Sequence, residues 1–380
     1  MNPPAHAGRS LEKRLRPALA LASLFVFALF GHTSKARAGQ EQKPDASSLK
    51  ADRPAVRPGI WTSAAELATL ATSGPAWLQL KAVADADLGT ANISDQKSDH
   101  DVKTLAVALV YARLGGDFYR QKAAKAIGAA IGTESGGRTL ALGRNLAAYV
   151  FAADLIDLRN YDATLDRLFR DWLAEVIRKK LDGKSLIDTH EERPNNWGTH
   201  AGAARIAADL YLNDAEDLRR AAKVFQGWLG DRSAYAGFDY GHLSWQADPK
   251  KPVGINPPGA SRDGRSIDGA IPDDMRRGGS FQWPPRHTVY PWGAMEGALI
   301  QAELLHRAGC DAWNWSDKAM LRASRFLFDL DHEFGDWWSV GDDAWMPWLF
   351  NRAYETNYPA KSPARPGKSM GWTDWTHSAR

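Results

Sequence analysis

The stretch LDRLFRDWLAEV, residues 165–176, indicates the fold class of this chain. Its apolar residues recur every three or four positions between charged ones, which is the period of an amphipathic helix and not of a strand. This stripe consists of Leu165, Leu168, Phe169, Trp172, Leu173 and Val176. A second stripe with the same period consists of Val102, Leu105, Ala106, Leu109 and Val110. Both segments are predicted to be helices that bury one face.

The helical period continues through most of the chain. Further helices are predicted at about 65–83, 119–132, 140–158, 197–212, 215–229, 291–308 and 317–330. Because short links between successive amphipathic helices favour antiparallel hairpins, we expect an all-α protein, an incomplete (α/α) toroid of antiparallel helical hairpins with a central cleft. Residues 230–290 and 331–380 lack the period. Long irregular segments inside a domain are usually functional, so we expect these two to flank the cleft.

The first 38 residues resemble an export signal. A basic start precedes an apolar run from Ala18 to Phe30, and Ala36-Arg37-Ala38 supplies a small-x-small cleavage site. We expect cleavage after Ala38 and a periplasmic or secreted protein. The apolar run is shorter than the ~20 residues of a membrane span, so we expect no membrane association after cleavage. Residues 39–58 are rich in proline, serine and charge and are predicted to be a disordered leader to a domain at 59–380.

The charge balance argues against a nucleic-acid-binding role. Removing residues 1–38 takes away six of the 48 Lys and Arg but only one of the 45 Asp and Glu, so the formal charge falls from +3 to about −2. The basic character therefore belongs largely to the signal, and we expect no nucleic-acid partner. Cys310 is the single cysteine, which excludes an internal disulfide. We expect a monomer.

Two segments carry groups suited to removing a proton beside a carboxylate. Asn195-Asn196-Trp197-Gly198-Thr199-His200 supplies amide and imidazole groups, and residues 268–290 supply Arg277, Arg286, His287 and Tyr290. In β-elimination of a 4-linked uronate, donors aimed at the carboxylate stabilise the enolate-like charge that develops when the C5 proton leaves. A base takes that proton, and an acid protonates the departing O4. A tyrosine can serve as both, provided that nearby positive charge makes its phenolate accessible.

Each of these residues has a structural alternative. Asn196 could be a helix N-cap, and His200 could be an ordinary polar helix residue. Tyr290 could be a buried tyrosine with one partner. His242, in the irregular region, is a second candidate imidazole. Tryptophans such as Trp197, Trp245 and Trp345 could stack on sugar rings or pack in the core. No metal-ligand cluster or phosphate loop is present, so we expect no metal or cofactor.

These segments resemble the alginate lyase superfamily of polysaccharide lyases, which includes glucuronan lyases. Residues 195–200 are similar to its early Asn-Asn motif, and residues 268–277 followed by Tyr290 are similar to its later motif. The resemblance implies that Tyr290 is the acid and base and that Asn196 neutralises the carboxylate together with Arg277 or Arg286. It also implies that the segments around Asp99 and His100, and around Arg144 and Asn145, line the cleft.

The sequence departs from the family pattern in two places. The gap from Arg277 to Tyr290 is longer than in the family, which makes Arg286 a rival for the guanidinium. Trp197 stands where the alginate-specific branch has a histidine, which leaves His200 or His242 to supply the imidazole. The acidic polysaccharide substrate is therefore expected to be alginate (polymannuronate) or glucuronan. Two other functions compete with a lyase. One is a glycoside hydrolase that uses paired carboxylates such as Asp274 and Asp343, and the other is a non-catalytic periplasmic protein that binds an acidic polysaccharide.

Overall fold

The computed structural model describes residues 59–335, 337 and 344–378. The chain divides into two units, Met1–Lys43 and Pro44–Arg380. The first unit, with the predicted signal and cleavage site, lies outside the described residues, as does the predicted leader at 39–58. None of the described helices combines the length and the hydrophobicity that crossing a bilayer requires.

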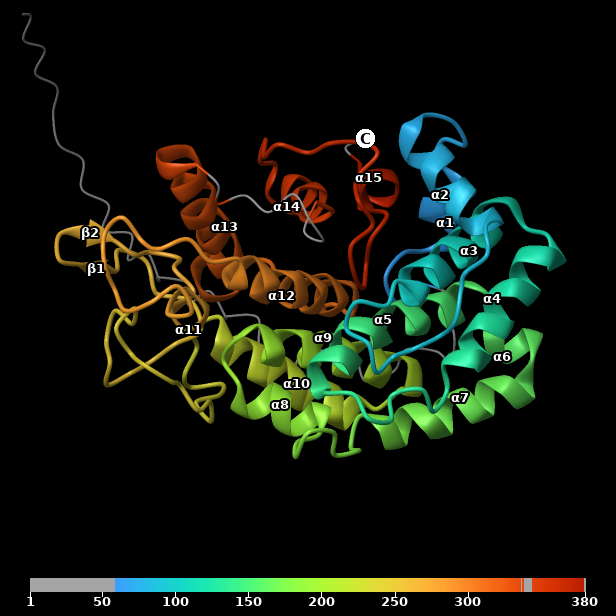
Figure 1. The fold of residues 1–380 in the computed structure, drawn as a ribbon, viewed down its shortest axis with the longest axis horizontal. Coiled ribbons are helices and arrows are strands. Elements are labelled where there is room, and N and C mark those ends of the chain that lie inside the picture. The colour runs from blue at the N-terminus through green and yellow to red at the C-terminus, as the bar shows by residue number, and fades with distance from the viewer. Residues whose placement is uncertain (1–58, 336, 338–343, 379–380) are drawn as a thin grey trace, which may run out of the picture. The chain divides into compact units, whose positions relative to one another are not determined.

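The predicted all-α class is confirmed, because helices dominate the described chain (Figure 1). The strands that accompany them, β1 (Ser261–Arg262) and β2 (Arg265–Ser266), form a short antiparallel pair. The toroidal arrangement stays a prediction. The helices are α1 (Ala64–Ala68), α2 (Pro75–Asp85), α3 (His100–Leu114), α4 (Asp117–Ala130), α5 (Thr139–Leu155), α6 (Leu158–Tyr161), α7 (Ala163–Val176), α8 (Leu186–Glu192), α9 (Asn196–Leu212), α10 (Ala215–Trp228), α11 (Pro272–Met275), α12 (Tyr290–Arg307), α13 (Trp315–Phe334), α14 (Met346–Tyr354) and α15 (Thr373–Thr376).

Local signals explain where several helices begin and end. The expected helix at 65–83 is two helices, because Gly74 adopts a positive φ of 85° and Pro75 then starts α2. Gly115 ends α3, where its N–H donates to the Tyr111 carbonyl. Ser185 starts α8 through a reciprocal capping box with Asp188. The irregular 331–380 segment contains α14 and α15, which are too short to give a clear period.

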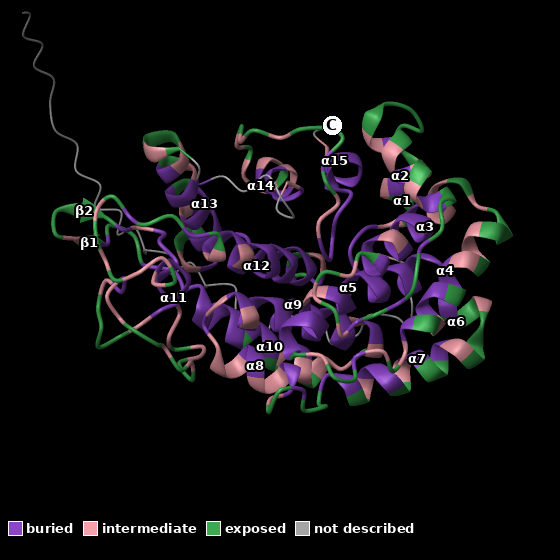
Figure 2. Ribbon diagram, viewed as in Figure 1, coloured by how far each residue is buried: buried purple, intermediate pink, exposed green. Residues whose placement is uncertain are grey.

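Three helices, α5, α9 and α12, form the buried centre of this unit (Figures 1 and 2). Nearly every residue of each is buried, as expected for helices that are apolar on all sides. Glycines allow their close approach. A Cβ at Gly143 of α5 would lie 3.0 Å from the backbone of His200, and one at Gly297 of α12 would lie 2.4 Å from the His200 nitrogen.

The same contacts fix the direction of the three helices. Asn196 of α9 lies beside Gly293 of α12, and Thr199 lies beside Gly297. The guanidinium of Arg138, the residue before α5, lies against the ring of Trp197. Helices α5, α9 and α12 therefore run in the same direction, with their first turns side by side. The positive ends of three helix dipoles meet at that point, which favours an anionic ligand there.

The C-terminal segment packs back onto α3 and α5. The buried Lys368 Nζ donates to Asn145 Oδ1 at 2.7 Å and to Asp101 Oδ1 at 3.3 Å. Trp372 Nε1 donates to the Val102 carbonyl at 2.9 Å, and Ser369 Oγ donates to the Arg144 carbonyl at 3.1 Å. Complete burial raises the pKa of Asp101 to about 6, although Lys368 acts in the opposite direction.

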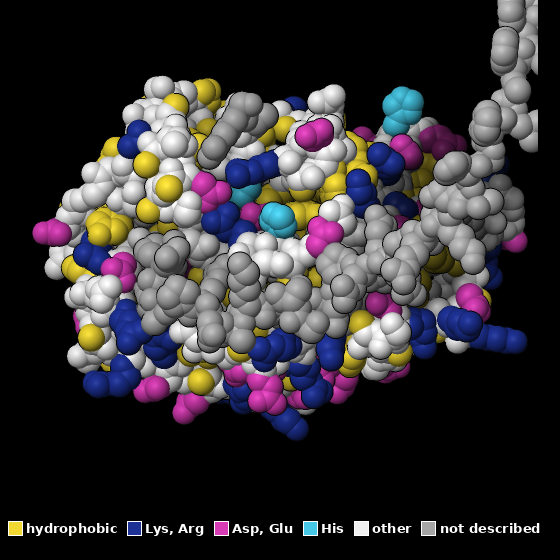
Figure 3. All heavy atoms as spheres, turned by 180° about the vertical axis from the view of Figure 1, so that it is seen from behind, with side chains coloured by type: hydrophobic (Ala, Val, Ile, Leu, Met, Phe, Trp, Pro, Cys, Tyr) yellow, Lys and Arg dark blue, Asp and Glu magenta, His cyan; other side chains and the backbone are white. Residues whose placement is uncertain are grey.

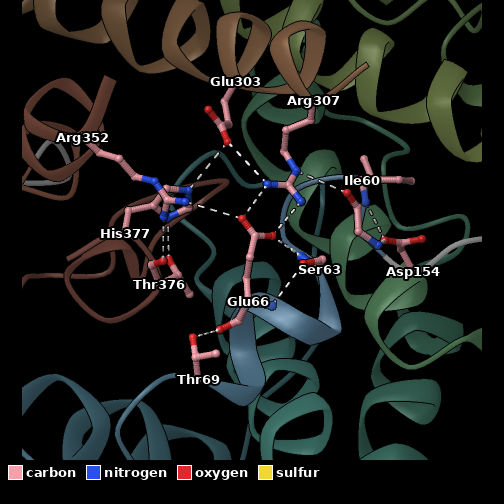
Figure 4. A network of polar contacts seen from close by, with 11 residues as sticks. Ile60, Ser63, Glu66, Thr69, Asp154, Glu303, Arg307, Arg352, Thr376 and His377 are labelled. Atoms are coloured by element: carbon pink, nitrogen blue, oxygen red, sulfur yellow. Dashed lines mark hydrogen bonds and ion pairs between the residues drawn. The ribbon is translucent and has the colours of Figure 1, made fainter. Parts of the chain in front are cut away.

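A polar network joins α1, the end of α12 and the C-terminal segment (Figure 4). We call Glu66, Glu303, Arg307, Arg352 and His377 the terminal clasp. Arg307 donates to both carboxylate oxygens of Glu66, at 3.2 and 2.9 Å, and Arg352 donates to Glu66 at 3.5 Å. Glu303 lies 3.9 Å from both Arg307 and His377. The clasp connects residues more than 280 positions apart in sequence, Glu66 and Arg352.

Candidate active site

Tyr290 begins α12, and the guanidinium of Arg277 lies over its ring. The Arg277 Cζ atom is 3.9 Å from the ring centroid, a favourable cation–π distance. Tyr290 is half-buried and Arg277 is exposed. Tyr290 was expected just before the helix, but it is the first helical residue. Pro291 occupies the next position, where its missing backbone N–H breaks no helical hydrogen bond. The phenol is thereby held at the start of α12 beside a full positive charge.

The short helix α11 places Arg277 by docking on the start of α9. Asp273 accepts hydrogen bonds from Asn195 Nδ2 at 3.1 Å and from Arg276 Nε at 2.7 Å. Asp274 Oδ1 accepts the backbone N–H of Asn196 at 3.2 Å, and a carboxyl oxygen is a good partner for a free donor in a first helical turn. Burial, followed by the charge of Asp273, raises the pKa of Asp274 well above its usual range.

Asn195, and not Asn196, is the N-cap of α9. Its side chain accepts the Trp197 N–H at 3.1 Å, so the capping alternative for Asn196 is wrong. The side chain of Asn196 is buried, and its Oδ1 has no hydrogen-bond partner among the described residues. Its Nδ2 would lie 3.7 Å from a Cβ at Gly293, which is one turn after Tyr290. A buried amide oxygen without a partner requires an explanation, and a ligand hydroxyl that donates to it beside Tyr290 is one.

His200 lies one turn deeper in α9 than Asn196. Its side chain is 1% exposed, and its Nε2 is 3.2 Å from Glu296 Oε2 of α12. The same carboxylate oxygen is 3.7 Å from Nη2 of Arg144 in α5. The ion-pair contacts of His200, Glu296 and Arg144 therefore join the three central helices one turn beyond Asn196.

Arg286 and His287 lie on the segment that leads into Tyr290, and both are exposed. The Arg286 Cδ would lie 3.6 Å from a Cβ at Gly279, so its stem runs along the turn that follows Arg277. The His287 ring meets the edge of Trp337, with the centroids 5.6 Å apart. Of the two candidate arginines, Arg277 is therefore the one in contact with the Tyr290 ring.

Comparison with protein families gives one match. Residues 99–238 fit the family model described as alginate lyase. This segment runs from the residue before α3 to beyond α10, and it includes the Asn195–His200 motif but not Arg277 or Tyr290. Residues 99–238 are thus similar to alginate lyases, and the match indicates a polysaccharide lyase enzyme. A comparison with curated protein sequences found no match.

In this lyase, His242 is exposed and lies on a separate loop. Its Nδ1 accepts the Ser244 N–H at 3.3 Å, and the neighbouring Gly241 N–H donates to Asp273 at 3.2 Å. Among the described residues, no contact joins His242 to Tyr290 or Asn196. The structure thus places His200 one helical turn from Asn196, and it places His242 on a loop that contacts α11 through the Gly241 N–H.

The three candidate tryptophans differ in accessibility. Trp197 is half-buried next to Asn196. Trp245 is 1% exposed, and its Nε1 donates to the Gly279 carbonyl at 3.1 Å. Trp345 is fully buried. Trp245 and Trp345 are too buried to stack on a sugar and are assigned to packing, whereas Trp197 stays in the candidate site because it is half-buried and next to Asn196.

The segments expected to line the cleft make mostly internal contacts. Asp99 is exposed and pairs with Lys103 at 3.0 Å. His100 is buried, with its Nδ1 2.8 Å from the Tyr149 hydroxyl, and burial lowers its pKa. Asn145 donates to the carbonyls of Ile93 and Asp95. Asn145 and Arg144 support the centre from behind, and Asp99 makes no contact with Tyr290, Arg277 or Asn196 in the described chain.

Two large pockets of the lyase are lined by other residues. One, of about 550 Å³, is bounded by the terminal clasp, and one, of about 560 Å³, lies between the β1–β2 pair and α13. The chemistry-bearing groups identify the site at Tyr290 better than pocket size does. Within the described ranges, no group of three or more His, Cys, Asp or Glu side chains is arranged to hold a metal ion.

Sequence reasoning missed Glu296 and undervalued Asp274. A signal for Glu296 was present, because it is the one acidic residue between Tyr290 and Gln301, in an otherwise apolar helix. Such a buried carboxylate needs a partner. Asp274 was considered only as a hydrolase acid, since its role at the start of α9 depends on a contact across 78 residues.

Proposed function

We propose that this lyase cleaves a 4-linked uronic-acid polymer by β-elimination, with Tyr290 as both base and acid. The observation that carries the proposal is the position of Arg277 over the Tyr290 ring, with the Asn196 amide one helical turn away. Positive charge beside the phenol stabilises the phenolate, and the Nδ2 group of Asn196 can donate to the substrate carboxylate. The first turns of α5, α9 and α12 add the positive ends of their dipoles.

The reaction balances without water. The Tyr290 phenolate takes the proton from C5, while Asn196 and Arg277 stabilise the charge that spreads onto the carboxylate. The electron pair left on C5 forms the C4–C5 double bond, and the pair of the C4–O4 bond leaves with O4. The neutral Tyr290 then gives the same proton to O4. His200 and Glu296 pair with each other, and their side chains, 1% and 2% exposed, are too buried to contact the sugar.

The preferred substrates are polymannuronate and glucuronan. Mannuronate and glucuronate have the same configuration at C4 and C5, so one residue on one face of the sugar can remove the proton and protonate O4 in both. Trp197, in the place of a histidine, makes glucuronan as good a candidate as alginate. We further propose that the protein acts in the periplasm or outside the cell, on the basis of the signal-like residues 1–38.

The test is incubation of the mature protein with polymannuronate, polyguluronate, glucuronan and hyaluronan while absorbance is monitored. A lyase leaves an unsaturated, ultraviolet-absorbing uronate at the new non-reducing end. We expect absorbance to rise with polymannuronate or glucuronan. If the polymers are shortened without a rise in absorbance, the enzyme is a hydrolase, and if none is shortened, the proposal fails.

The hydrolase alternative has little structural support. Asp274 is completely buried and binds the first turn of α9, so it has no access to a glycosidic oxygen. Its proposed partner Asp343 lies outside the described residues.

A further inference from the structure

Two arginines lie against the ring of Trp197, the residue that follows Asn196. The Cζ of Arg193 is 4.4 Å from the ring centroid, and the Cζ of Arg138 is 5.3 Å from it. Arg193 is the C-cap of α8, Arg138 is the N-cap of α5, and Trp197 lies in the first turn of α9. We call these three residues the Arg–Trp–Arg stack.

The positive charge of the stack is not compensated by a carboxylate of the described residues. In the described part of the chain, no carboxylate lies within 4.0 Å of either guanidinium. Arg138 Nη2 donates to the amide oxygen of Gln96 at 2.9 Å. The carboxylates nearest in sequence have other partners, because Glu192 pairs with Lys184, and Asp182 accepts the Thr139 N–H.

In the described chain, the Trp197 ring is the one with two arginines over it, whereas Arg262, Arg265 and Arg277, which also lack an ion pair there, each lie alone over a ring. Arg170 also lies over an aromatic ring, that of Tyr211, but it pairs with Asp166 at 2.8 Å. Two uncompensated cations on one indole repel each other, and an anion bound between them would remove that cost. Arg138 is exposed, whereas Arg193 and Trp197 are half-buried, so the stack is accessible from solvent.

The position of the stack relates it to the cleavage site. Trp197 is adjacent to Asn196, and the first turns of α5 and α9 meet beside it. A uronate polymer carries a carboxylate on every sugar, so a sugar bound at Asn196 and Tyr290 brings the carboxylates of its neighbours along the same surface. Figure 3 shows basic and acidic side chains interspersed with hydrophobic ones on one face of the molecule.

We propose that the Arg–Trp–Arg stack is a subsite that binds the carboxylate of a uronate next to the sugar that is cleaved. Guanidinium groups bind carboxylates in a fork geometry, and the indole keeps both forks oriented. The identity of the ligand as a uronate polymer rests on the proposed function. The cationic subsite itself rests only on the contacts of Arg138, Trp197 and Arg193.

The experiment compares the double variant Arg138→Gln/Arg193→Gln with wild type on the polymer that wild type cleaves. We expect KM to rise about tenfold while kcat stays within about twofold, since the reacting groups are unchanged, and tenfold corresponds to about 1.4 kcal/mol. Added salt should weaken binding less in the variant, because two exposed charge contacts are gone. Arg138→Lys/Arg193→Lys should recover part of the affinity.

The matched control is Arg159→Gln. Arg159 is an exposed arginine on α6 that makes no side-chain hydrogen bond or ion pair in the described chain. The KM of the Arg159→Gln variant should therefore stay at the wild-type value. Thermal unfolding of each variant checks that the fold is intact. A KM and a salt dependence equal to wild type in the double glutamine variant would overturn the subsite.

Binding separates this inference from the proposed function. Polymannuronate and glucuronan are titrated calorimetrically into Tyr290→Phe with and without the two glutamine substitutions. Weaker binding in the triple variant supports the subsite, even if wild type cleaves neither polymer and the proposed function fails. Equal binding in the two proteins contradicts the subsite, even if wild type is an active lyase.

Discussion

Arg277 places a full positive charge 3.9 Å from the centre of the Tyr290 ring, and no other arginine of the described chain contacts that ring. The side chain is held there by α11, whose aspartates bind the first turn of α9. The charge on Arg277 serves two purposes in the proposed reaction, since it favours the phenolate and attracts the substrate carboxylate. Its removal should therefore affect the chemical step and not only binding.

We predict that Arg277→Gln lowers kcat by about 100-fold, the usual effect of removing one preorganised donor from an oxyanion-type site. Arg286→Gln is the matched control, because Arg286 is exposed on the neighbouring segment and does not contact the Tyr290 ring. Steady-state absorbance assays measure both variants. A larger loss of kcat in Arg286→Gln than in Arg277→Gln would reverse their roles.

At the scale of helices, the contact between α9 and α12 depends on glycine. A Cβ at Gly297 would lie 2.4 Å from the His200 nitrogen, which is backbone and has no room to move aside. A Cβ at Gly293 would lie 3.7 Å from Asn196, which is ordinary contact. The two glycines are one turn apart on the same helix, so they form a matched pair for substitution.

We predict that Gly297→Ala destabilises the protein by about 1–3 kcal/mol through overpacking. Gly293→Ala should leave the free energy of unfolding unchanged or raise it slightly, because alanine favours a helix by up to about 1 kcal/mol over glycine. Chemical denaturation measures both. Equal destabilisation by the two substitutions would show that the helices are not packed as closely as described.

Helical periodicity predicted most elements, because the long helices each bury an apolar stripe that repeats every three or four residues. The expected segments 140–158, 197–212 and 291–308 correspond to α5, α9 and α12 with ends shifted by at most three residues. The break at Gly74-Pro75 was missed, since apolar residues continue across it. Helices α14 and α15 were missed because so few turns give no readable period.

The candidate site was predicted only in part. Asn196, Arg277 and Tyr290 carry recognisable chemistry within short motifs, so their side chains could be identified before their positions were known. The roles of Asp273 and Asp274 depend on contacts with residues 78 positions away, which no local pattern encodes. The choice between Arg277 and Arg286, and the burial of Trp245 and Trp345, likewise depend on tertiary packing alone.

At the scale of the whole chain, the terminal clasp joins the start of the described fold to its end. Burial alone would raise the pKa of Glu66, but hydrogen bonds from Arg307 and Ser63 outweigh it and lower the pKa from 4.5 to about 2. A carboxylate with a lowered pKa stabilises the folded state above its unfolded pKa. That contribution is lost as the pH falls from 4.5 through 2.

We predict that Glu66→Gln lowers the melting temperature at pH 7 and that the difference from wild type shrinks as the pH falls from 4.5 towards 2. Part of Glu66 is exposed to solvent, which screens its ion pairs and keeps the effect modest. Glu175→Gln, at an exposed glutamate of α7 without an ion pair in the described chain, is the control. A difference that stays constant across this pH range would exclude the Glu66 carboxylate as its source.

The most direct measurement of the proposed chemistry compares Tyr290→Phe with wild type on the cleaved polymer, by absorbance for turnover and by calorimetry for binding. The substitution removes only the phenolic oxygen that carries the proton from C5 to O4. Turnover should fall by at least about 100-fold, within the range expected for a general acid and base, while the Kd for the polymer changes little. Turnover at the wild-type rate in Tyr290→Phe would contradict the mechanism.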